Sequence, residues 1–124
     1  MEYSVVFSEE DAIVQVTILS RATEKDHFAA MNEVFKLCRE HSCSSILVDL
    51  REMNSQAFST FECFTFGKIF AERSPHFWLA HVLPADSETR NDVKFTSTVE
   101  ANRGKSTGEF ATVEEARQWL LEAR

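Results

Sequence analysis

Glycine and proline are scarce in this sequence, which has 3 glycines and 2 prolines in 124 residues. Their scarcity excludes collagen-like and low-complexity chains, which use these residues in quantity. Basic residues are also in the minority, 13 against 20 acidic ones, and the formal net charge is −7. Because such a charge repels phosphate backbones and anionic lipid headgroups, we expect neither nucleic acid nor a membrane as a partner.

Long apolar runs and paired cysteines are lacking as well. No apolar run reaches membrane-spanning length, and the chain opens without a basic segment followed by an apolar stretch. Cys38, Cys43 and Cys63 form an odd set without the spacing of a disulfide framework. Reduced thiols are typical of the cytoplasm, so we expect a cytoplasmic protein.

Hydrophobic residues make up 44% of the chain and charged residues 27%, a balance typical of globular proteins. A chain of this length is expected to form one domain over residues 1–124 with one core. Period-two patterns, helical spacings and capping signals predict the elements in order. Strands are expected at 3–7, 14–18, 46–50, 77–83 and 109–111, and helices at 24–41, 60–73, from Asp86 or Ser87 to Gly104, and from Thr112 onward.

This order, β-β-α-β-α-β-α-β-α, defines the expected fold class. Two alternating runs around a short acidic turn predict an opening hairpin. After the hairpin each strand is followed by a helix, which predicts right-handed crossovers and helices packed on a mostly parallel sheet. We therefore expect an α/β protein with a mixed sheet.

Two motifs suggest a cofactor and are explained better without one. Gly104-Lys-Ser-Thr resembles part of a nucleotide-binding loop, but that loop needs a glycine five positions earlier, where the chain has Val99. Cys38, His41 and Cys43 lie close together, but structural zinc takes four ligands and no second Cys/His pair stands at a matching spacing. We expect no cofactor and no metal.

A catalytic constellation is not recognisable either. The chain has serines, cysteines and 4 histidines, but no G-x-S-x-G nucleophile elbow. His81 lies in an apolar strand and is expected to be a hydrogen-bonded core histidine. We therefore expect no enzyme; an enzyme would require a cleft where His, Glu and a Ser or Cys converge.

Phenylalanine is unusually frequent, with 11 copies, and many of them cluster around the helix expected at 60–73. At 3.6 residues per turn these side chains do not share one narrow face. One stripe should pack on the sheet, while the other needs a second partner. That partner can be a neighbouring helix, a protein surface or an apolar ligand. The cluster consists of Phe58, Phe61, Phe64, Phe66 and Phe70.

The element order, the segment "SSILVDL" at 44–50 and the closing segment "EANRGKSTGEFATVEEARQWL" together resemble the STAS domain family, in particular the stand-alone bacterial SpoIIAA-like anti-sigma-factor antagonists. The resemblance implies a domain that works by binding. It also implies that a partner kinase phosphorylates a serine at the start of the helix after the third strand and so switches the interface off.

Carried onto this chain, the resemblance places Asp49 at the acidic position that closes the third strand, with Ser55, Ser59 and Thr60 as stand-ins for the serine. The chain departs from the family by lacking the Asp-Ser-x-Gly core. Ser59 to Glu62 reads as a capping box, which gives Ser59 a structural reason to be there. Ser55 is therefore the better candidate for a regulatory hydroxyl.

The expected function is a regulatory or binding module that contacts a protein partner or a second copy of itself. The alternative is a carrier or sensor that encloses a small apolar ligand between the Phe-rich helix and the sheet. The expected working surface follows the third strand and comprises Asp49, Asn54, Ser55, Ser59, Thr60, Phe61 and Phe64.

Overall fold

The computed structural model describes residues 2–53, 60–73, 77–103 and 106–123, without the side chains of residues 60–64 and 66. The described elements follow the expected order. They are the strands β1 (Tyr3–Ser8), β2 (Ile13–Ile18), β3 (Ser45–Asp49), β4 (Trp78–Val82) and β5 (Ser106–Phe110), and the helices α1 (Glu24–His41), α2 (Thr60–Arg73), α3 (Ser87–Ala101) and α4 (Val113–Ala123).

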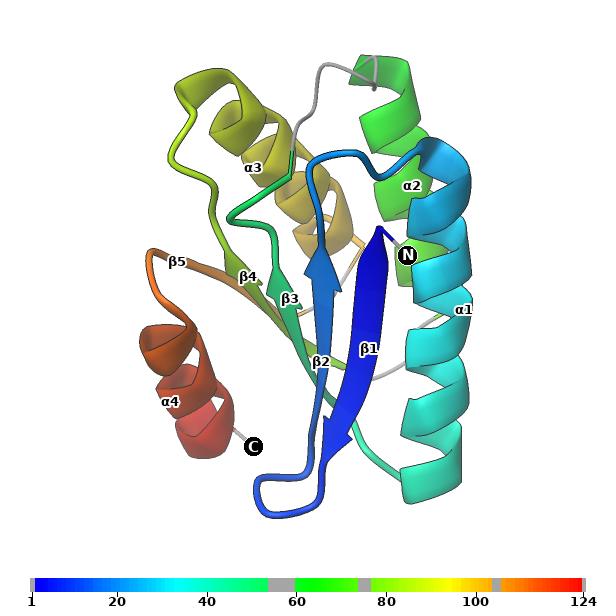
Figure 1. Ribbon diagram of the computed structural model, residues 1–124, viewed down its shortest axis with the longest axis vertical. Coiled ribbons are helices and arrows are strands. Elements are labelled where there is room, and N and C mark those ends of the chain that lie inside the picture. Colours follow the sequence, from blue (N-terminus) through cyan, green and yellow to red (C-terminus); the bar gives the residue numbers. More distant parts are fainter. Residues whose placement is uncertain (1, 54–59, 74–76, 104–105, 124) are drawn as a thin grey trace.

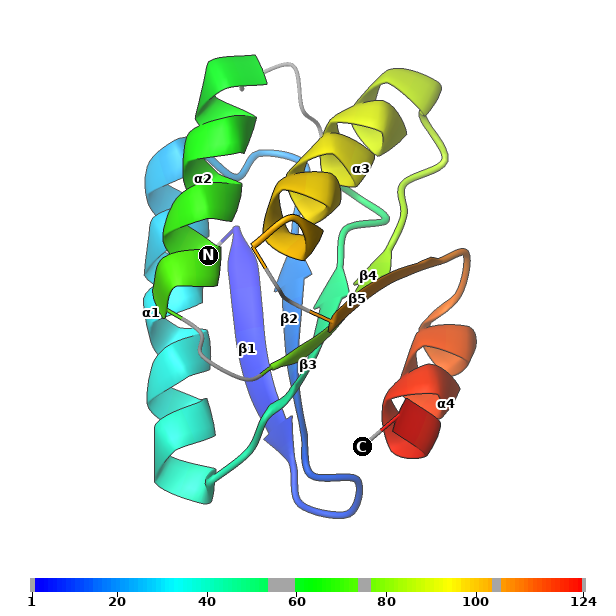
Figure 2. The same ribbon diagram turned by 180° about the vertical axis from the view of Figure 1, so that it is seen from behind.

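The five strands form one mixed sheet in the order β1-β2-β3-β4-β5. β1 pairs antiparallel with β2, and every later pair is parallel. Because the sheet grows in one direction and parallel crossovers are right-handed, the three connecting helices must lie on the same face. Figures 1 and 2 show this arrangement, with α1, α2 and α3 on one side of the sheet and α4 on the other.

The opening hairpin has the predicted form. Tyr3 pairs with Ile18 and Ser8 with Ile13, and Ala12 takes a left-handed conformation (φ 55°) in the turn. Asp11 in the same turn forms an ion pair with Arg117 of α4. The turn is thereby tied to the helix on the second face.

Local hydrogen bonds account for where the helices begin and end. The Thr23 hydroxyl accepts from the Asp26 backbone N–H at 3.2 Å, and the Asp26 carboxylate accepts from the Thr23 N–H at 2.9 Å, which completes a capping box on α1. Ser42 ends α1 in the left-handed conformation. Asp86 caps α3, and the Thr112 hydroxyl accepts from the Glu115 N–H at the start of α4.

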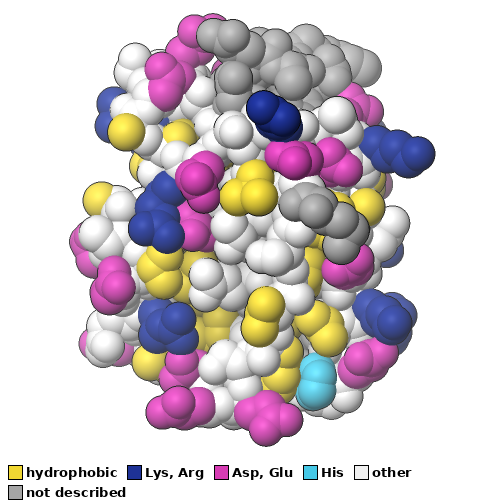
Figure 3. All heavy atoms as spheres, in the orientation of Figure 1, with side chains coloured by type: hydrophobic (Ala, Val, Ile, Leu, Met, Phe, Trp, Pro, Cys, Tyr) yellow, Lys and Arg dark blue, Asp and Glu magenta, His cyan; other side chains and the backbone are white. Residues whose placement is uncertain are grey.

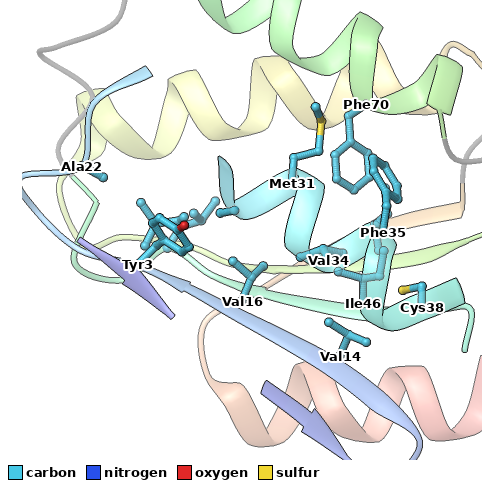
Figure 4. Packing of buried hydrophobic residues seen from close by; sticks show 14 of the residues in the cluster. Tyr3, Val14, Val16, Ala22, Met31, Val34, Phe35, Cys38, Ile46 and Phe70 are labelled. Atoms are coloured by element: carbon cyan, nitrogen blue, oxygen red, sulfur yellow. The ribbon is translucent and has the colours of Figure 1, made fainter. Parts of the chain in front are cut away.

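Each face of the sheet carries its own hydrophobic cluster. On the three-helix side, α1 contributes Met31, Val34 and Phe35 to the cluster, and the centroids of the Phe35 and Phe70 rings, on α1 and α2, lie 5.1 Å apart (Figure 4). α2 and α3 approach closely, because a Cβ atom at Gly67 would lie 3.1 Å from the Thr96 carbonyl oxygen. The cluster on the α4 side consists of Ile13, Leu47, Ala80, Val82, Ala116 and Leu120.

The helix bounds predicted at 24–41 and 60–73 are confirmed, as is the coverage of the third strand on both faces, where Ile46 and Leu47 are fully buried. The last strand was predicted too short: it begins at Ser106, because pairing with β4 extends as far as Trp78. Its half-exposed edge position explains why it lacks an apolar signature. The third helix ends at Ala101, and Gly104 lies outside the described residues.

Within the described ranges, no helix combines the length and apolar character needed to cross a membrane. On the face of the molecule seen in Figure 3, lysine and arginine side chains are scattered singly among acidic ones. Among the side chains that the structure describes, the large hydrophobic ones classed as exposed are Val6, Phe95 and Leu121.

Candidate functional site

Asp49 is the one predicted surface residue whose side chain the structure describes, and it is buried at the end of β3. Its carboxylate accepts hydrogen bonds from Arg51: from the backbone N–H at 3.2 Å, from Nε at 2.9 Å and from Nη2 at 2.8 Å. This fork shapes the turn after the strand. Asp49 therefore has a structural role that needs no partner.

The other predicted surface residues cannot be assigned contacts. Asn54, Ser55 and Ser59 lie outside the described residues, and the same is true of the side chains of Thr60, Phe61 and Phe64 within α2. Phe70 is the member of the Phe cluster that can be placed, and it packs into the core on Phe35.

A cavity of about 80 Å³ lies between the sheet and the three helices of the first face. Its walls are mainly aliphatic and come from β2, β3, α1 and α3, with Phe70 contributed by α2. Among the wall residues Glu24 is exposed, and the half-buried ones are Val48, Met53, Asp92 and Thr96, so the side nearest solvent lies among these residues. The apolar wall residues include Val16, Ile18, Met31, Val34, Leu50 and Val93.

Two ionisable side chains face each other in the wall of this cavity. Nε2 of His81 on β4 lies 3.3 Å from Oε1 of Glu100 on α3. His81 is 5% exposed and Glu100 is 2% exposed, so both groups are removed from water. Within the described residues Oε1 has no hydrogen bond of good geometry, so the contact is an ion pair by distance.

The charge state of His81 follows from two opposing effects. Burial disfavours the imidazolium, but the close Glu100 carboxylate opposes this effect, helped by Glu109 and the Gly108 backbone. The net result is a raised pKa for His81. The contact with Glu100 therefore favours the protonated form of the His81 imidazole.

His27 of α1 lines the same cavity and behaves in the opposite way. Burial lowers the pKa of His27 from 6.5 to about 4, although the charge of Asp26 acts in the other direction. His27 is thus neutral at pH 7. The cavity wall thus contains one neutral imidazole and one close His–Glu pair among apolar side chains.

Histidine and glutamate therefore converge at this cavity, two of the groups expected of an enzyme. An enzyme would also need a nucleophile, and among the described wall residues Thr96 carries a hydroxyl group. Its Oγ1 donates a hydrogen bond to the Asp92 carbonyl oxygen at 3.2 Å. A hydroxyl bound in this way to its own helix is poorly placed as a nucleophile. The cavity wall therefore offers a hydrogen-bond acceptor, the Glu100 carboxylate.

The Cys38, His41 and Cys43 cluster has structural contacts. The His41 ring stacks on Phe7 with centroids 3.9 Å apart, and Cys43 Sγ donates to the Ala12 carbonyl oxygen at 3.1 Å. A hydrogen bond to Cys43 and burial raise the pKa of the Cys38 thiol. In the described part of the chain, no group of three His, Cys, Asp or Glu side chains is placed to hold a metal ion.

Glu100 is the site residue that sequence reasoning missed. A signal for it exists, because Glu100 lies two helical turns after Val93 and so shares its buried stripe. A glutamate on the buried side of a helix requires a polar partner. His81, a polar residue in an otherwise apolar strand, is a candidate for that partner.

Comparison with models of known families, with curated proteins and with solved structures gives no match to this chain.

Proposed function

We propose that this chain is a non-enzymatic binding module whose working site is the cavity under α1, α2 and α3, and that it takes a small, mostly apolar ligand. The observation that carries the proposal is the cavity itself, with an apolar wall and the buried His81–Glu100 pair. Native cores contain few voids larger than a water molecule, and a buried ion pair seldom stabilises a fold better than apolar packing would. A void and an ion pair at the same place favour a ligand site.

We also propose a STAS-like architecture for the module. Support comes from the element order, the opening antiparallel hairpin and the parallel strands that follow it. Regulation through a protein partner, with Ser55 as the modified residue, stays a prediction, because Ser55 lies outside the described residues.

Xenon under pressure tests whether the cavity accepts an apolar guest, because dry apolar cavities bind xenon. We expect xenon to shift the methyl NMR signals of Met31, Val34 and Val93. Ala30 lines the cavity, so Ala30→Leu should abolish these shifts. Ala123→Leu adds the same group at an exposed site and should leave them unchanged.

Native mass spectrometry of the gently purified protein provides the second measurement. We expect a small molecule bound to the wild-type protein and lost in Ala30→Leu. The absence of both a bound molecule and xenon-induced shifts would overturn the proposed function.

A further inference from the structure

The polar end of the cavity defines the chemistry of its ligand more closely than the apolar wall does. Building on the proposed function, we propose that the ligand is a small uncharged alcohol whose hydroxyl donates a hydrogen bond to the Glu100 carboxylate. The hydrocarbon part of the alcohol lies against the aliphatic side chains of α1, α3 and the sheet.

The Glu100 carboxylate has acceptor capacity to spare. An ionised carboxylate offers about four lone-pair sites, and the contact with His81 uses at most one of them. Oε1 lies at ion-pair distance from Nε2, but without hydrogen-bond alignment among the described residues. Buried acceptors require donors, and a hydroxyl from a ligand would supply one.

Charge balance selects an uncharged ligand over an ionic one. Glu100 already faces His81, so a bound ammonium group would add a net charge to a buried site. An anion is disfavoured by Glu24 and Asp92 on the side nearest solvent and by a net charge of −7. His27 is neutral at pH 7 and does not attract an anion.

The size of the cavity restricts the hydrocarbon part. Its volume of about 80 Å³ is smaller than the engineered cavity of about 150 Å³ that admits benzene. The hydrocarbon part of the ligand is therefore expected to be a short chain. A longer ligand would extend past Met53 toward solvent.

Three probes with one branched carbon skeleton test the proposal by NMR titration. Isobutanol carries the hydroxyl, isopentane has a methyl group in its place, and isobutylammonium carries a positive charge. We expect isobutanol and isopentane to shift the signals of Val34 and Val93. Isobutylammonium should bind at least about tenfold more weakly than isobutanol, because its charge is not balanced.

The decisive quantity is the ratio of the isopentane to the isobutanol dissociation constant. Hydrogen bonds to charged groups are the stronger class, so Glu100→Met should change this ratio by about tenfold or more in favour of isopentane. Glu122→Met removes a carboxylate from an exposed position of α4, on the other face of the sheet, and should leave the ratio within about twofold.

A measurement on the wild-type protein covers the case in which Glu100→Met does not fold. The carboxyl ¹³C signal of Glu100 should move when isobutanol saturates the cavity and stay in place with isopentane. An unmoved signal, or equal ratios in wild type and Glu100→Met, would overturn the alcohol and leave the apolar site standing. Tighter binding of isobutylammonium would replace the alcohol by a cation. No binding by any probe would remove the proposed function as well.

Discussion

The two faces of the sheet are built on different principles. On the α4 side, six apolar side chains, each at most 1% exposed, form a closed cluster. On the three-helix side, a larger hydrophobic cluster lies around a cavity, and the cavity wall also contains the buried side chains of His27, His81 and Glu100. The same sheet thus supports a fully packed layer and an incompletely packed one.

The two faces also differ in how a buried carboxylate is paired with a basic side chain. Asp49 belongs to the α4 side by strand alternation, and its charge is met by Arg51, whose side chain is 55% exposed. The carboxylate of Glu100 instead faces His81, and both side chains are buried. The first pair can rearrange in water, while the second is fixed in place. The α4 side is therefore the closely packed layer, while the three-helix side holds the cavity and the buried His81–Glu100 pair.

The largest expected effect is on the packed face. Leu120→Ala removes a fully buried side chain of the α4 cluster and should lower the free energy of unfolding by about 3 to 5 kcal/mol. Leu121→Ala, at the neighbouring position that is 38% exposed, should lower it by less than about 1 kcal/mol. Urea denaturation measures both. Similar losses for the two variants would contradict a closed cluster under α4.

The second effect concerns pH and the three-helix face. The pKa of His27 falls from 6.5 in the unfolded chain to about 4 in the folded one, so the unfolded state binds the proton first as the pH drops. The stability is fully present above pH 6.5 and declines toward pH 4, in total by about 3 kcal/mol.

His27→Leu provides the control for this pH effect. The difference in unfolding free energy between wild type and His27→Leu should change between pH 6.5 and 4. Denaturant titrations at several pH values measure it. A constant difference across this range would mean that His27 is not buried as a neutral imidazole.

The third prediction uses a pair of variants, one on each face of the sheet. Ala30→Val adds methyl groups at the cavity and should raise stability by about 0.5 kcal/mol or more after the cost of valine in a helix. Ala116→Val adds them to the packed cluster, where Ala116 is fully buried, and should lower stability by about 1 to 3 kcal/mol. Thermal unfolding gives the signs. Equal signs would remove the contrast in packing.

The smallest effect should be the same on both faces. Thr23 caps α1 and Thr112 caps α4 through the same kind of hydroxyl hydrogen bond. Changing either threonine to alanine should cost about 1 kcal/mol in chemical denaturation. A much larger loss at one cap would show that the two helices differ in more than the layer they cover.

Local signals in the sequence were sufficient for most elements of the fold. The capping box at Thr23 and the spacing of Met31, Phe35 and Cys38 predicted α1 with its observed bounds. The edge strand β5 was predicted poorly, because its residues owe their conformation to pairing with β4. The strand order was not predicted, because it depends on contacts between distant segments.

The candidate site was harder to predict than the fold. His81 and Glu100 belong to different elements, and their approach depends on how α3 crosses the sheet. Sequence reasoning directed attention to the junction after Asp49, where the structure gives Asp49 a structural partner in Arg51. The buried face of each element was predictable from the sequence. The contact between the side chains of His81 and Glu100 was not.

The sequential strand order has a consequence for synthesis on the ribosome. Each strand pairs with the one made just before it, so every new strand meets a completed partner as the chain emerges. α3 is made after β4, and Glu100 is the penultimate residue of that helix. Until α3 docks, His81 faces water without its counter-charge. Most of the sheet can thus pair before α3 brings Glu100 to His81.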